Sequence, residues 1–194
     1  MKKKEGSTII GVTVIFSITL MMVLITFALS INIIQNQSET VSDDIVCSEL
    51  AAFKHIDKLE LGGSEKIDRL IINEHEKAFD TFKDYLKTNL GLDYSFYPIS
   101  DYNFIKGKVD IIAFKIYNVD GNDVEIITYS DSNPEKTTEI KRGGKGVVVT
   151  PKGNIVNHTT INAEIGFHIK PMFLDEKYVT KMEETDILVE GEED

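Results

Sequence analysis

The sequence predicts an α+β protein in which one long N-terminal helix carries a domain built from a second helix packed on an antiparallel β-sheet. Three observations predict this fold. An uncharged apolar run extends from Ile9 to Ile34, a helical repeat of apolar residues follows it, and alternating strand patterns occupy the second half of the chain. The expected organisation is a basic cytoplasmic leader, a transmembrane helix, an extracytoplasmic α+β domain and a flexible acidic tail, over residues 1–6, 7–35, 36–180 and 181–194.

The transmembrane helix is predicted from length and composition. The run from Ile9 to Ile34 contains no Lys, Arg, Asp or Glu. Roughly 26 helical residues reach about 39 Å, which exceeds the ~30 Å hydrocarbon core of a bilayer. The side chains expected to face lipid are large and apolar: Ile9, Ile10, Val14, Ile15, Phe16, Leu20, Leu24, Phe27 and Leu29.

Charges on either side of the span predict its orientation. Lys2, Lys3 and Lys4 precede it, whereas residues 35–44 carry acids and no base. The positive-inside rule therefore predicts a single-pass protein of the cell membrane, with its N-terminus in the cytoplasm and its domain outside. The alternative is a signal peptide cleaved at Ala28-Leu29-Ser30. The apolar run is longer than the apolar core of a typical signal peptide and continues past this site, which favours a retained anchor.

A helical repeat continues beyond the span. It contains apolar residues interleaved with charged residues that include Asp43, Asp44 and Glu49, and Gly62-Gly63 is expected to end it after Leu61. One continuous helix is favoured, and two helices with a break at residues 36–38 are the alternative. The residues expected to pack this helix against the domain are Val41, Ile45, Leu50, Phe53 and Ile56.

The rest of the domain shows one helical and several strand patterns. Asn73 is expected to cap a helix that Gly91 ends. Strands are expected over 109–119, 124–129 and 161–169, with Asp120-Gly121 as a tight turn, and the polar segment 130–146 is interpreted as a loop or ragged edge.

Composition and motifs argue against catalysis. The net charge of −11 disfavours nucleic acid and anionic lipid headgroups as ligands. His75-Glu76 begins like a zinc-protease helix, but Phe79 stands where the second His is required. The lone Cys47 is interpreted as a small core residue. We therefore expect no enzyme activity, no metal, no cofactor and no small-molecule substrate.

The leader ending in Gly6, the uncharged helix, its amphipathic continuation and the helix-plus-sheet head together resemble type IV pilin-like proteins. Within that group they are most similar to pilin-like and pseudopilin components of Tad-type pilus systems in Gram-positive bacteria. The resemblance implies cleavage between Gly6 and Ser7, after which the apolar helix packs against copies of itself in a filament. The family places a Glu at the fifth mature position, which is Gly11 here, so the resemblance points to a minor component.

The partners implied are the membrane and other pilin-like subunits or assembly components. Two other functions remain as alternatives. One is a permanently anchored extracellular binding or sensing module, and the other is an exported enzyme or lipid-handling domain, which the missing catalytic residues disfavour.

Overall fold

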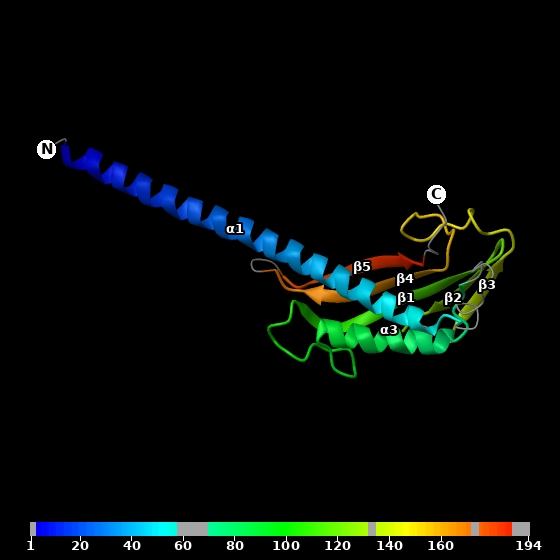
Figure 1. The fold of residues 1–194 in the computed structure, drawn as a ribbon. Coiled ribbons are helices and arrows are strands. Elements are labelled where there is room, and N and C mark those ends of the chain that lie inside the picture. The colour runs from blue at the N-terminus through cyan, green and yellow to red at the C-terminus, as the bar shows by residue number, and fades with distance from the viewer. Residues whose placement is uncertain (1–2, 58–69, 132–134, 172–174, 188–194) are drawn as a thin grey trace.

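The computed structural model of the chain describes residues 3–57, 70–131, 135–171 and 175–187. It confirms an α+β arrangement, in which a long helix projects from a head made of a second helix and a five-stranded antiparallel sheet (Figure 1). The elements are α1 (Lys3–Ala52), the 3₁₀ turn η1 (Phe53–His55), α3 (His75–Leu90), β1 (Ile105–Asp120), β2 (Asp123–Tyr129), β3 (Thr137–Lys141), β4 (Thr160–Ile169) and β5 (Lys177–Asp186).

Helix α1 is continuous through residues 36–38, so the alternative of two helices is wrong. The sequence has neither Pro nor Gly between Gly11 and Ala52, and therefore nothing in it breaks the helix. The helix ends at Ala52, earlier than expected, because Ile56 turns to an extended conformation and pairs with Ile72. Leu61 and the Gly62-Gly63 pair lie outside the described residues.

The sheet has the strand order β3-β2-β1-β4-β5. Strands β1 and β2 form the expected hairpin, in which Asp120 pairs with Asp123 and Gly121 has a φ of 59°. That positive φ is the conformation that a two-residue hairpin turn requires and that glycine adopts without strain. The long β1 pairs on its other edge with β4, which carries the alternating pattern expected over 161–169.

Both helices cover the same face of the sheet (Figure 1). Helix α3 packs on β1 through Phe82 and Phe114, whose ring centroids are 4.7 Å apart. Asn89, near the end of α3, donates through its side chain to the Asp44 carbonyl of α1, and Thr81, in the first half of α3, contacts His55 just after α1. The two helices therefore run antiparallel. The opposite face is covered in part by residues 146–158, where Val156 packs against Tyr117, Val119 and Val124.

The two edge strands of the sheet carry weak sequence signals. Strand β3 lies within the segment 130–146, for which the sequence predicts a loop or ragged edge, and it forms one edge of the sheet. All five of its side chains are exposed, so it carries no apolar alternation. Strand β5 extends to Asp186, so residues 181–186, which were predicted to belong to the flexible acidic tail, are part of the sheet. The acidic residues of β5 suggest a tail because charged side chains are typical of solvent-exposed segments. An edge strand can nevertheless carry them, since its backbone hydrogen-bonds to one neighbouring strand while its side chains stay in water.

The start of α3 also differs. The N-cap residue is Glu74, whose side chain makes no cap hydrogen bond, and Asn73 instead donates to Asp57. The predicted end is confirmed, because Gly91 caps the helix in the left-handed conformation.

Candidate functional site: the projecting helix and its junction with the head

The first half of α1 projects from the head without contact (Figure 1). Each residue predicted to face lipid, from Ile9 to Leu29, keeps at least 49% of its surface exposed. This is the one described helix that is long and apolar enough to cross a membrane. So large an apolar surface is stable in water only when something covers it.

The head begins to cover α1 at Ser30, which is only 8% exposed. Ile34 and Ser38 follow on the same side as half-buried residues, and Val41 is buried. The uncovered stretch from Ile9 to Leu29 is about 31 Å long at the helical rise per residue, which equals the thickness of a hydrocarbon core. Gly6 and Ser7 lie in the first turns of α1, and a side chain at Gly11 would meet open space.

Four of the five residues predicted to pack on the head are buried: Val41 and Ile45 in the second half of α1, Phe53 in η1, and Ile56 directly after η1. Leu50 is 52% exposed, so its assignment to the packed face is wrong. It follows Ile45 by five positions, which turns its side chain about 140° around the helix axis from the buried face.

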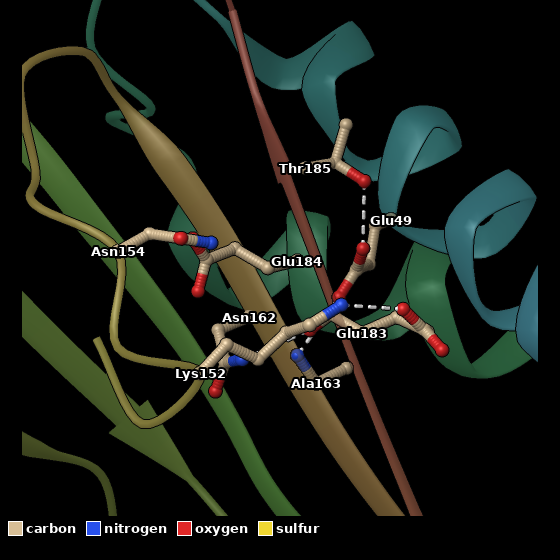
Figure 2. A network of polar contacts seen from close by, with 8 residues as sticks. All are labelled: Glu49, Lys152, Asn154, Asn162, Ala163, Glu183, Glu184 and Thr185. Carbon is tan, nitrogen blue, oxygen red and sulfur yellow. Dashed lines mark hydrogen bonds and ion pairs between the residues drawn. The ribbon is translucent and has the colours of Figure 1, made fainter.

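Glu49 occupies the place expected of Leu50. Four residues after Ile45, it shares that buried face and is 0% exposed. Oε1 of its carboxyl group accepts a hydrogen bond from the backbone N–H of Ala163 in β4 at 2.8 Å, and Oε2 is hydrogen-bonded to the Thr185 hydroxyl of β5 at 2.7 Å. Figure 2 shows this carboxyl reaching from α1 to both strands.

A second layer of polar contacts surrounds Glu49. Lys152 pairs with Glu183 at 2.7 Å, and the Glu183 carbonyl accepts a hydrogen bond from the Asn162 side chain at 2.9 Å. Asn154 donates to Glu184 at 3.1 Å (Figure 2). These contacts tie the segment after β3 to the edge strand β5, on which Glu49 depends.

Burial raises the pKa of Glu49 from 4.5 to about 8. The hydrogen bonds from Thr185 and Ala163 oppose this rise, the charge of Glu183 adds to it, and Lys152 opposes it. The carboxyl is therefore mainly protonated at neutral pH, which removes the cost of burying a charge. Glu49 acts as a neutral hydrogen-bonding link between α1 and the sheet.

Sequence reasoning placed Glu49 among the exposed charges and Cys47 in the core, and the structure reverses both. Cys47 is exposed, whereas Ser48 and Glu49 are buried. The spacing of Val41, Ile45 and Ala52 contained the necessary signal, because these positions define a face that includes 48 and 49 but not 47 or 50.

The histidines next to the junction have structural partners. His75 Nδ1 lies 2.7 Å from the Tyr129 hydroxyl, and burial lowers the pKa of His75. His55 contacts Thr81 at 2.9 Å. Among the described residues, no group of three or more His, Cys, Asp or Glu side chains is placed to hold a metal ion.

No family model, curated protein or solved structure matches this chain. The projecting helix and its junction with the head are therefore the features that bear on its function.

Proposed function

We propose that the chain is a minor pilin-like subunit that is held in the cell membrane before assembly and then enters a filament of the Tad or type IV-like kind. The single observation that carries the proposal is the division of one unbroken helix into two parts. Its uncovered apolar part fits the thickness of a bilayer, and the remainder is built into the core of the head. Such a helix gives a neighbouring subunit a long apolar surface to pack against once it leaves the lipid.

The junction supports this role because it joins the helix firmly to the head. Val41, Ile45 and Phe53 contribute to the main core, and Glu49 bonds to two strands. A tether needs only to reach the membrane, and a flexible linker would serve. A subunit whose head must be placed by helix packing requires a rigid joint instead.

A permanently anchored binding or sensing module is the second candidate, and Gly11 favours it. The Glu found at this position in the resembling family pairs with a neighbour's N-terminal amine, which Gly11 cannot do. In this alternative the helix stays in the bilayer with the N-terminus in the cytoplasm and the head outside.

The N-terminal residue of the mature protein, purified from its own host, distinguishes the two candidates. Processing of the pilin type gives a chain that begins at Ser7. A chain that retains Lys2, Lys3 and Lys4 identifies a permanent anchor, and a chain that begins near Ile31 identifies a cleaved signal peptide. Either of the last two results contradicts the pilin-like proposal. A Gly6→Leu variant is the matched control, because a large residue at the cleavage position should block a peptidase that requires Gly.

A further inference from the structure

The loop between α3 and β1 exposes aromatic side chains to an unusual degree. Within this aromatic loop, residues 93–104, Tyr94 is 95% exposed, Tyr102 is 99% exposed and Ile99 is 74% exposed, and Tyr97 is also exposed. A head domain of this size has no folding reason to place three tyrosines and an isoleucine in water on one loop.

The aromatic loop is held in shape by its own hydrogen bonds. Asp93 Oδ1 accepts from the backbone N–H groups of Ser95 and Tyr97 at 2.8 and 2.9 Å. Asn103 donates to the Leu90 carbonyl at 2.8 Å, and Phe96 and Phe104 pack inward against the core. The exposed tyrosines therefore stand on a fixed scaffold.

The fold places this loop at the end of the head from which the apolar helix projects (Figure 1). Helix α3 runs antiparallel to α1, with Asn89 near its C-terminal end contacting Ser48. The chain that follows Gly91 therefore continues toward the uncovered half of α1. A bilayer that contains residues 9–29 would lie on this side of the head.

The charge around the loop also differs from that of the whole chain. The chain carries a net charge of −11, yet residues 87–108 contain three lysines and two aspartates. One of them, Lys106, bonds to the Asp101 carbonyl within the loop. The segment 87–108 therefore does not share the net negative charge that disfavours binding to anionic lipid headgroups.

We propose that the aromatic loop rests on the outer leaflet of the bilayer while the helix is inserted, with Tyr94, Ile99 and Tyr102 entering the headgroup region. Tyrosine is enriched at membrane interfaces because its ring enters the apolar boundary while its hydroxyl remains hydrated. The loop lies at the end of the head from which the apolar helix projects, so a membrane that contains the span faces the loop. This inference rests on the membrane-inserted state of the proposed function and adds a second contact to it.

Single tryptophans test the inference, because the chain contains no Trp. The full-length protein is placed in phosphatidylcholine vesicles at high lipid excess, with a fraction of the lipids carrying a nitroxide quencher near the headgroup end of the acyl chain. Tyr102→Trp reports on the loop, and Phe16→Trp reports on the span. Ile140→Trp is the matched control, because Ile140 is also exposed but lies in β3 at the far end of the head (Figure 1). Tyr94→Trp repeats the loop measurement at a second position.

The proposal expects lipid quenching of Phe16→Trp and Tyr102→Trp and none of Ile140→Trp. Quenching of Phe16→Trp alone overturns the loop contact and leaves the membrane anchor intact. Failure to quench Phe16→Trp refutes the anchor and with it the inference. If Tyr102→Trp is shielded from aqueous acrylamide but not quenched by lipid, the loop contacts another copy of the chain, and the membrane contact is again overturned.

Discussion

Replacing Glu49 with Gln tests whether a neutral carboxyl links α1 to the sheet. Glutamine has the same shape, its carbonyl oxygen can accept from the Ala163 N–H, and its amide can donate to Thr185. It cannot ionise. The Glu49→Gln variant should therefore keep the link at every pH, whereas the wild-type protein should weaken as Glu49 loses its proton.

The sign and size of the effect follow from the raised pKa. The folded state holds the Glu49 proton to about pH 8 and the unfolded chain only to about pH 4.5. The stabilisation is therefore complete below pH 4.5, declines as the pH rises, and is lost above pH 8. At 1.36 kcal/mol per pKa unit, the separation of the two values sets a ceiling of about 5 kcal/mol on the loss.

The assay is urea unfolding of the full-length protein in detergent micelles, followed by far-UV circular dichroism from about pH 5 to pH 8.5. The free energy of unfolding should fall by several kcal/mol for the wild type and remain nearly constant for Glu49→Gln. The reasoning is refuted if both proteins fall in parallel, or if the wild type does not change.

Other titrating groups are controlled by comparing variants. Glu183 and Lys152 face Glu49 from β5 and from the segment after β3, and both remain in Glu49→Gln. His75 has a lowered pKa, so it contributes stability that grows with pH, opposite to the expected trend. Glu139→Gln, on the exposed strand β3, is the matched substitution that should leave the wild-type decline in place.

Two further predictions concern the helix. Ile45→Asp places an unpaired charge in the core and should reduce the free energy of unfolding by more than about 3 kcal/mol. Leu50→Asp should change it by less than about 0.5 kcal/mol, because Leu50 is half exposed. Equal effects of the two substitutions in urea titrations would contradict the assigned buried face. Cys47 is exposed on α1 beyond the span, so a membrane-impermeant maleimide should label intact cells, with Cys47→Ser as the unlabelled control; labelling that appears only after lysis would reverse the proposed orientation.

The sequence predicted elements whose local pattern and tertiary setting agree. The apolar residues of the alternating pattern in strand β4 enter the main core, and Gly91 ends α3 because it can adopt the left-handed conformation. The apolar run of α1 was equally clear, since no charge interrupts it. In these segments the order of apolar and polar residues along the chain is enough to predict the element.

The sequence-based predictions were wrong where burial or strand pairing depends on residues distant in the sequence. Glu49 looks like a surface residue until Ala163 and Thr185 are brought to it from more than 100 positions away. Leu50 looks like a core residue when only the spacing between apolar residues in the sequence is considered. Its direction around the helix axis, about 140° from that of Ile45, places it on the exposed side. Strand β5 looks like a tail because its side chains are charged, and only pairing with β4 makes it a strand.

The unbroken helix also has a mechanical consequence. With no hinge between Gly11 and Ala52, the span and the head form a single lever. The centre of the packed half, near Ile45, lies about 39 Å along the axis from the middle of the span near Thr19. If the apolar half is inserted in a membrane as proposed, a tilt of about 10° swings the head sideways by about 7 Å. A change in bilayer thickness, or a force applied to the N-terminal end of the helix, would therefore displace the head.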